Sequence, residues 1–248
     1  MDLIEFHGPP PRRHPWEAAR RAFFSRELAR AGMLNRPIAA LDVGAGDAWF
    51  AEQIAQQIPD GSSIDCWDPA YAAAPAIAPV SPKIHLVARL PEKKFDLLLL
   101  MDVLEHVPAD QEFLSTLVSG HLRPGGTALI SVPAWPALFS SHDRRLKHFR
   151  RYTPSGARRL IGASGLAIVR AGGLFHSFLA VRALQKMIER WSRQAPPMPD
   201  LGEWAGSRWW TASLTGILGM EGRVSSWFAK NKWSFPGLSY WALCRKPS

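Results

Sequence analysis

The sequence predicts an α/β fold built on a parallel sheet with helices on both faces. Short, almost continuous apolar runs alternate with segments of helical periodicity over residues 37–173. Strands that are buried on both faces have such runs, and the helical segments between them are typical of right-handed crossovers joining parallel strands. With 248 residues, of which 47% are hydrophobic, the chain is long enough to bury one sizeable core.

The individual elements follow from the same periodicities. A first helix is expected over residues 14–32, where Pro15 and Gly32 bracket apolar side chains at helical spacing. Strands are expected at IAALDV (38–43), SSIDCW (62–67), KIHLV (83–87), FDLLLLM (95–101), TALISV (127–132), LAIVRAGG (166–173) and SYWALCRK (239–246). Helices are expected between them at AWFAEQIAQQI (48–58), QEFLSTLVSGHL (111–122) and SGARRLIGASG (155–165).

The chain is expected to divide into four parts: a front-helix region at 1–36, an α/β core at 37–173, a helical insert at 174–238 and a last strand at 239–248. The insert is rich in tryptophan and basic residues, and the linker-like segment Arg193–Gly202 joins its two expected helices. The first of these, LFHSFLAVRALQKMIERW (174–191), gathers apolar residues on one face. This pattern suits core packing, a lid over a substrate, or a helix lying on a membrane.

Charge and cysteine content suggest the setting of the protein. A formal net charge of +9 and a pI near 10.1 favour anionic partners, including an anionic membrane surface. Cys66 and Cys244 lie in apolar runs and are expected to be reduced thiols. No signal-peptide pattern is evident, and no run approaches the roughly 18 consecutive apolar residues of a spanning helix. We therefore expect a cytoplasmic protein, soluble or peripheral to the inner face of the membrane.

A glycine turn marks the first candidate binding site. The stretch LDVGAGDAWF places Asp42, Gly44 and Gly46 between a strand and a helix. Glycines there allow the backbone to approach a ligand closely, and the helix start offers N–H groups. A dinucleotide fingerprint would need a third glycine at Trp49, so a nicotinamide or flavin site is disfavoured. About 20 residues further on, Asp68 ends the second strand, where a carboxylate accepts hydrogen bonds from the hydroxyls of a ribose.

Five motifs follow one another along the chain: LDVGAGDAWF, IDCWDPAY, FDLLLLMDVLEHV, LRPGGTALISVP and FRRYTPSGARRL. On these motifs, from about Trp16 to Gly173 and again from Ser239, the chain resembles the class I S-adenosylmethionine-dependent methyltransferases of the ubiquinone and menaquinone type. The resemblance implies a Rossmann-like, seven-stranded, mostly parallel sheet with an antiparallel last strand. It also implies S-adenosyl-L-methionine as the cofactor.

The resemblance further implies which residues hold that cofactor. The glycine turn would hold the methionine part, Asp68 the ribose, and the backbone after the fourth strand would close over the methionine end. The cofactor-binding residues are therefore expected to be Asp42, Gly44, Gly46, Asp68, Met101 and Asp102. Two positions depart from the family pattern. Ala48 stands where the family often has glycine, and LVARLPEKKFD after the third strand offers only Arg89 near the place of the usual adenine contact.

The basic stretch SSHDRRLKHFRRYT (140–153) leaves the carboxyl end of the sheet, where open α/β folds bind their ligands. We expect it to be an ordered lid that faces the substrate, with a solvated basic face or a nucleic-acid strip as the alternatives. Its expected substrate contacts are Asp143, Arg144, Arg150, Arg151 and Tyr152, since arginines pair with carboxylates and phosphates. His142 or His106 is the expected general base.

MDVLEHV adds a candidate metal site. Asp102, Glu105 and His106 lie at the end of the fourth strand, close to where His142 should fold back. Two carboxylates and two imidazoles can hold a divalent ion such as Mg²⁺ that has open positions for an acceptor oxygen. In the alternative interpretation, Glu105 and His106 only cap and pack a helix, and no metal is bound.

These features predict a methyltransferase that acts on a small-molecule or lipid-linked acceptor, with O-methylation favoured and N- or C-methylation still open. An RNA 2′-O-methyltransferase is one alternative, because plant-type small-RNA enzymes share an arrangement resembling Asp102, Glu105, His106 and His142. Nucleic acid is disfavoured since the chain shows no recognisable RNA-binding module. A cofactor-binding partner protein without catalysis is the other alternative, and the oligomeric state is not predicted.

Overall fold

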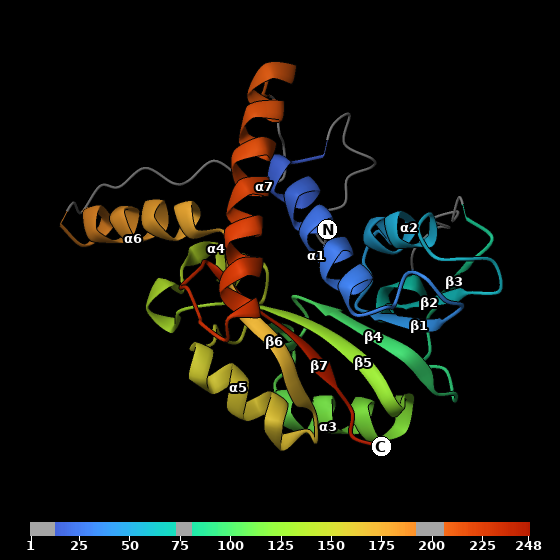
Figure 1. The fold of residues 1–248 in the computed structure, drawn as a ribbon. Helices are drawn as coiled ribbons and strands as arrows, with labels where there is room; N and C mark the ends of the chain where they lie inside the picture. Colours follow the sequence, from blue (N-terminus) through green and yellow to red (C-terminus); the bar gives the residue numbers. More distant parts are fainter. Residues whose placement is uncertain (1–12, 73–80, 192–205) are drawn as a thin grey trace.

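Seven strands form one sheet in the computed structural model, which describes residues 13–72, 81–191 and 206–248. Their order is β3-β2-β1-β4-β5-β7-β6 (Figure 1). The strands are β1 Ala39–Val43, β2 Ser63–Trp67, β3 Ile84–Val87, β4 Phe95–Met101, β5 Leu122–Pro133, β6 Ala167–Leu174 and β7 Ser239–Arg245. β7 pairs antiparallel with both β5 and β6, whereas the other pairs are parallel. The expected mostly parallel sheet with an antiparallel last strand is therefore confirmed.

Helices cover both faces of this sheet (Figure 1). They are α1 Pro15–Arg30, α2 Trp49–Ala55, α3 Asp110–His121, α4 Ser141–Arg145, α5 Pro154–Ala163, α6 His176–Trp191 and α7 Arg208–Lys230. Short 3₁₀ turns lie at Pro69–Ala72, Leu104–His106 and Pro136–Leu138. One apolar cluster joins the sheet to α1, α2 and α7, and a second joins it to α3 and α5. The two clusters explain why the strands are apolar on both faces.

The parallel strands bring their carboxyl ends to one edge of the sheet. The glycine turn follows β1, Asp68 follows β2, and the turn Leu104–His106 follows β4. The segment with α4 follows β5 and ends at Thr153, whose Oγ1 accepts a hydrogen bond from Gly156 N at 3.0 Å and caps α5. Motifs far apart in the sequence thus meet at the same edge, as expected for an open α/β sheet.

The segment between β6 and β7 is less separate than the sequence suggests. α7 packs against α1, and its residues Leu218 and Ala229 are buried in the same apolar cluster as α1. Gly222 of α7 is so close to Phe23 that an added Cβ would lie 3.1 Å from the ring. The predicted linker Arg193–Gly202 falls outside the described residues.

Two further expectations concern the cysteines and membrane-spanning helices. Cys66 and Cys244 are free and buried, as expected. In the residues that the structure describes, no helix is long and apolar enough to cross a membrane.

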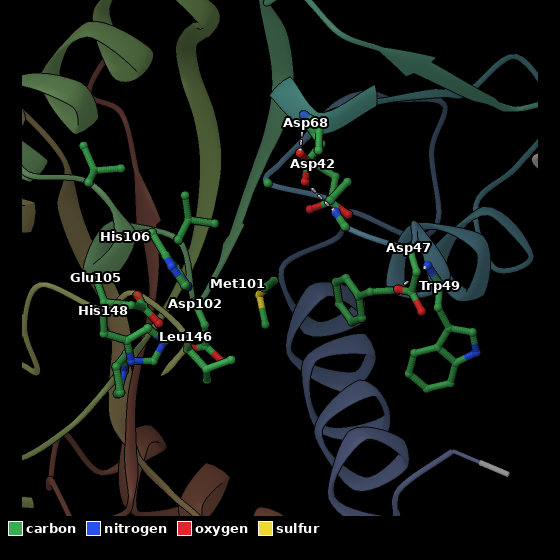
Figure 2. A pocket seen from close by; sticks show the side chains of 18 of the residues that line it. Asp42, Asp47, Trp49, Asp68, Met101, Asp102, Glu105, His106, Leu146 and His148 are labelled. Carbon is green, nitrogen blue, oxygen red and sulfur yellow. Dashed lines mark hydrogen bonds between the residues drawn. The ribbon is translucent and has the colours of Figure 1, made fainter. Parts of the chain in front are cut away.

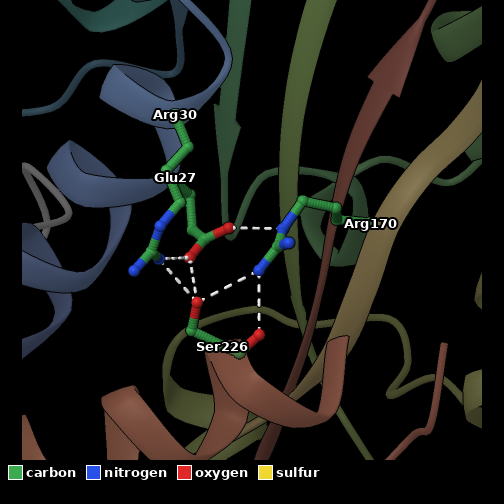
Figure 3. A network of polar contacts seen from close by, with 4 residues as sticks. All are labelled: Glu27, Arg30, Arg170 and Ser226. Atoms are coloured by element: carbon green, nitrogen blue, oxygen red, sulfur yellow. Dashed lines mark hydrogen bonds and ion pairs between the residues drawn. The ribbon is translucent and has the colours of Figure 1, made fainter. Parts of the chain in front are cut away.

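A buried carboxylate ties α7 to α1 and β6 (Figure 3). Glu27 is fully buried. Its two carboxylate oxygens form ion pairs with Arg30 Nη1 at 2.5 Å and Arg170 Nε at 2.8 Å. Ser226 of α7 donates its hydroxyl to the same carboxylate at 2.6 Å, and its carbonyl accepts from Arg170 Nη2 at 2.9 Å. Because these polar groups satisfy one another's hydrogen bonds, the network holds α1, β6 and α7 together at one point.

We expect Glu27→Gln to lower the free energy of unfolding by about 3–5 kcal/mol, because it removes the fully buried counter-charge of the partly buried Arg170. Urea unfolding followed by circular dichroism measures the change. Glu112→Gln, on the exposed surface of α3, is the matched control and should change stability by less than about 0.5 kcal/mol. Equal stabilities for the two variants would show that the network does not hold α7 in place.

Candidate active site

A cavity of about 640 Å³ opens at the carboxyl edge of the sheet (Figure 2). This volume is typical of pockets for small ligands and cofactors. All the residues expected to bind the cofactor line it: Asp42, Gly44, Gly46, Asp68, Met101 and Asp102. The acceptor-side motifs line the same space through Glu105, His106, His142, His148 and Arg151. The cavity therefore joins the two halves of the predicted site.

The glycine turn forms one wall of the cavity. Gly44 has φ +65°, and a Cβ there would lie 3.1 Å from Val103, so a side chain would meet both strain and a neighbour. Ala48 has φ +55°, which shows that the residue replacing the family's glycine is held in the left-handed conformation. The Asp68 carboxylate accepts from Gly46 N at 3.1 Å and from Ala70 N at 2.9 Å, and so links the glycine turn to the end of β2.

Two further carboxylates face the cavity beside the glycine turn. Burial raises the pKa of Asp42 to about 7, because a charged group loses its hydration there. Asp102 has φ +59° and sits directly after β4. Its carboxylate pairs with Arg20 Nη2 at 2.8 Å and accepts from Ser131 Oγ at 3.0 Å. These contacts hold a residue whose backbone is strained at the site.

The side chains of Glu105, His106 and His148 lie close together on the acceptor side of the cavity (Figure 2). One potential ligand atom from each lies within 4.8 Å of the others, and the two imidazole rings meet edge to face at 4.6 Å between centroids. Glu105 is fully buried, and within the described part of the chain neither of its carboxylate oxygens has a hydrogen-bond partner. Burial, followed by the nearby charge of Asp102, raises the pKa of Glu105 well above its ordinary value.

A second buried carboxylate, Asp143, organises the basic stretch. Its oxygens accept from Ser140 N at 2.8 Å and Ser140 Oγ at 2.9 Å, which starts α4 with a capping box. They also meet His148 Nδ1 at 3.1 Å and Arg151 Nε at 2.7 Å. Burial opposes the charge, but the hydrogen bonds from His148 and Arg151 hold the pKa of Asp143 below its ordinary value. Because an ionised carboxylate only accepts, Nδ1 of His148 carries the proton of this hydrogen bond, and Nε2 is the ring nitrogen that Asp143 leaves unengaged.

The chain reverses direction between His142 and His148. Lys147 has φ +58°, and the N–H groups of Lys147 and His148 donate to the carbonyls of Arg144 and Asp143 at 3.0 and 2.9 Å. This is the Schellman ending of a helix, here formed without glycine. Phe149 N then donates to Glu105 O at 2.8 Å, which joins the stretch to the turn that follows β4.

Comparison with known proteins identifies the fold and the family. Residues 16–171 match the methyltransferase-domain family. The chain belongs to this family. It is 33% identical over 126 residues to a ubiquinone biosynthesis O-methyltransferase of Paramagnetospirillum magneticum, which covers 46% of this chain and 50% of the relative. It is 28% identical over 165 residues to the enzyme of the same name from Rhizobium rhizogenes, covering 57% and 65%. The chain thus spans between about half and two thirds of the length of these relatives.

A solved structure agrees with the family's fold. The N-methyltransferase NodS from Bradyrhizobium japonicum, in complex with S-adenosyl-L-homocysteine, superimposes with a TM-score of 0.51. The match covers 95% of this chain and 89% of that one at 15% identity. At this identity the likeness shows the shared methyltransferase fold alone.

The acceptor side of the cavity is arranged differently from the sequence prediction in two respects. In the described residues, the cluster of potential metal ligands contains His148 in place of His142, and it excludes Asp102, which pairs with Arg20. Within the part of the chain that the structure describes, the predicted quartet of Asp102, Glu105, His106 and His142 is therefore not brought together as a single ligand set. The reason is the reversal at Lys147, which brings the second histidine of the stretch beside Glu105.

Most of the predicted substrate contacts lie outside the lining of the cavity. Arg151 lines the cavity, but Asp143, Arg144, Arg150 and Tyr152 are not among the described residues that do. Asp143 is fully buried in its own network, and Tyr152 donates its hydroxyl to Asp110 at 2.7 Å. Arg150 pairs with Asp110 at 2.9 Å, and Arg144 is exposed. Arg150 and Tyr152 thus hold the stretch against Asp110 of α3, and Arg144 faces solvent. His142 and His106 line the cavity as expected, while their catalytic role stays a prediction.

Sequence reasoning missed the contribution of the first helix. His14, Trp16, Glu17 and Arg20 line the cavity from α1 and its start. Burial lowers the pKa of His14 to about 4, so it is neutral near pH 7, and its Nδ1 accepts from Trp16 N at 3.2 Å. The polar residues on the helix face that also carries Trp16 were the available signal. Adenine contacts stay unassigned, since Arg89 is exposed and is not one of the described residues lining the cavity.

We expect Asp143→Asn to lower the free energy of unfolding by about 3–5 kcal/mol near pH 7, because Arg151 loses its buried counter-charge and His148 loses the carboxylate that accepts from its Nδ1. The pKa of Asp143 is lower in the folded state, so its stabilisation is complete above the unfolded pKa of about 4 and is lost as pH falls further. The stability difference from wild type should therefore shrink below about pH 4. Urea unfolding at several pH values tests this, with the exposed Asp60→Asn as control. A difference that does not vary with pH would contradict the role of the charge.

Proposed function

We propose that the chain is an S-adenosylmethionine-dependent methyltransferase that methylates an oxygen of a small-molecule or lipid-linked acceptor. One observation carries the proposal. A single cavity joins the glycine turn and Asp68 to the cluster of Glu105, His106 and His148. The first half suits the cofactor, and the second suits removal of a proton from an acceptor. Family membership and the two ubiquinone biosynthesis O-methyltransferases support the same reaction class.

The lining of the cavity fits this cofactor. Its sulfonium and ammonium groups are cationic, and Asp42, Asp68 and Asp102 all face the cavity. Burial raises the pKa of Asp42, so a bound cation would stabilise its ionised form. Gly44 forms part of the cavity wall, and any side chain at this position would narrow the cavity. The cofactor supplies an activated methyl group, and the protein supplies alignment and exclusion of water.

His148 is the residue best placed to take the proton of the acceptor. Asp143 fixes its ring through Nδ1 and leaves Nε2 as the proton acceptor. His106 lies against its ring, and His142 faces the same cavity, so both earlier candidates remain part of the proposal. Burial lowers the pKa of His142, which would keep that imidazole neutral and able to accept a proton. Arg151 is held by Asp143 at the edge of the cavity, where it could meet an anionic acceptor.

A divalent metal is a second way to activate the acceptor at the same place. The oxygens of Glu105 are buried and have no partner in the described residues, a state that either a proton or a cation would relieve. His106 and His148 complete a three-residue set with oxygen and nitrogen donors. Such an ion would lower the pKa of an acceptor hydroxyl. We favour the metal-free base because Asp143 already orients His148.

The alternatives have less support. The arrangement that resembled RNA 2′-O-methyltransferases included Asp102 and His142, and the structure does not bring these two into the ligand cluster of its described residues. A partner protein that binds cofactor without catalysis would not need a histidine oriented by a buried carboxylate. Cofactor binding without turnover on any acceptor would nevertheless support that alternative.

We expect the wild-type protein to bind S-adenosyl-L-homocysteine with micromolar or better affinity, and Asp68→Ala to weaken binding by about 1–3 kcal/mol. The substitution removes a carboxylate acceptor for the ribose and also its hold on Gly46 N. Isothermal titration calorimetry measures both values. Asp60→Ala, an exposed carboxylate outside the cavity lining, should leave the affinity unchanged. Absence of binding by the wild type would end the methyltransferase proposal.

We expect His148→Ala to lower turnover by ~10²–10⁴-fold while cofactor affinity is retained, because the base is lost and the cofactor half is untouched. Release of S-adenosyl-L-homocysteine with a panel of phenolic acceptors measures turnover. His106→Ala and His142→Ala test the other two imidazoles, and His85→Ala on the exposed side of β3 is the control. If His142 is the base, its lowered pKa predicts that activity rises with pH only below about 6.5 and is constant above it.

Chelation distinguishes the two forms of activation. The metal-free base predicts full activity after treatment with a chelator, in protein shown by elemental analysis to contain no divalent ion. Loss of activity on chelation and its return with Mg²⁺ would instead favour the metal site. Full activity in all three histidine variants would contradict both.

A further inference from the structure

The outer face of α7 carries an apolar stripe that the described chain leaves exposed. Its members are Trp210, Ile217, Met220, Val224 and Trp227, which we call the α7 stripe. Trp210 is 72% exposed, Met220 65% and Trp227 56%. Spacings of three, four and seven residues place all five on one side of a helix. A contiguous apolar surface of this kind marks an interaction site more often than a chance feature.

The opposite side of the same helix is occupied. Leu218, Gly222 and Ala229 pack toward α1, and Ser226 is held in the Glu27 network. This anchoring fixes the rotation of α7, so the stripe faces away from the core. Figure 1 shows that the end of α7 farthest from the sheet reaches beyond α1.

Basic and aromatic side chains surround the stripe. Arg223, Lys230 and Lys232 are exposed next to it, and Trp209 and Trp233 are 85% and 63% exposed near its two ends. On α7, the one acidic side chain is Glu221, whose oxygens accept from Ser177 N. The surface thus combines apolar area, tryptophans and positive charge.

The neighbouring helix α6 has a similar surface. Val181, Leu184 and Ile188 are about half exposed at spacings of three and four residues, and Arg182 and Lys186 lie on the same helix. α6 projects away from the sheet (Figure 1). Its contacts include the turn Pro136–Leu138, which leads into the acceptor-side lid.

We propose that the α7 stripe docks on the surface of an anionic lipid bilayer. Tryptophan with basic residues around an apolar helix face is the pattern of helices that lie in the membrane interface. Anionic headgroups complement Arg223, Lys230 and Lys232, whereas a second copy of a chain with a net charge of +9 would bring like charges together. The docking is peripheral, in agreement with the absence of a spanning helix in the described residues.

This inference goes beyond the proposed reaction and does not require it, because binding to lipid is measured without turnover. Cosedimentation of the full chain is compared between vesicles of phosphatidylcholine alone and vesicles that also contain phosphatidylglycerol. We expect binding to the anionic vesicles, release by salt, and little binding to the neutral ones. Arg223→Glu with Lys230→Glu should weaken binding by at least about fivefold for each positive charge removed.

The stripe itself is tested by Trp210→Ser combined with Trp227→Ser. We expect this double variant to lose at least about tenfold in vesicle affinity, since two large apolar side chains no longer enter the interface. Val169→Ser, which removes an equally exposed apolar side chain from β6, is the matched control and should bind as the wild type does. Thermal unfolding and affinity for S-adenosyl-L-homocysteine report whether each variant is folded.

Three results would overturn the proposal. The first is equal binding to neutral and anionic vesicles, and the second is unchanged binding by the tryptophan double variant. The third is a wild-type protein that binds neither kind of vesicle but forms a dimer, detected by light scattering after size exclusion. In this result the dimer is absent from the tryptophan double variant. That result would assign the stripe to a second copy of the chain.

Discussion

The acceptor side of the cavity depends on the buried carboxylate of Asp143. The segment around it has only one helix, α4, with five residues, which is too short to be stable by itself. Asp143 satisfies Ser140 at the start of that helix and His148 and Arg151 beyond its end. One desolvated charge therefore replaces the regular hydrogen bonds that a longer helix would supply. Its loss would release the ring of His148 from the place where it meets Glu105.

The parallel sheet determines where the segment 140–153 lies, because this segment follows β5. Parallel strands end at one edge, so the loops after β1, β2, β4 and β5 meet in a single cavity although they are distant in sequence. The cofactor half is made of short turns with left-handed backbone at Gly44 and Asp102. The acceptor half is made of side chains held by buried charge. Arg20 of α1 closes the space between them by pairing with Asp102.

The buried carboxylate of Glu27 likewise organises the packing of α7 against the core. Its carboxylate joins α1, β6 and α7 through Arg30, Arg170 and Ser226, and this fixes one side of α7 against the core. The other side keeps its tryptophans in solvent. The helix therefore contributes to the fold with one face and leaves the second face exposed. The core around the sheet and the proposed membrane surface are thus parts of one packed body, since α7 belongs to both.

The sequence by itself determined the features that depend on local pattern. Apolar runs predicted the strand segments, and the glycine turn with Asp68 predicted one wall of the cavity, because burial periodicity and turn chemistry act over a few residues. It predicted that the stretch from Ser140 would line the site. Only the tertiary structure decided which of its residues do so. The left-handed backbone at Lys147 places His148 beside Glu105, while Asp143 turns inward. That outcome depends on a buried charge network between distant segments, and such a network has no period that a sequence can display.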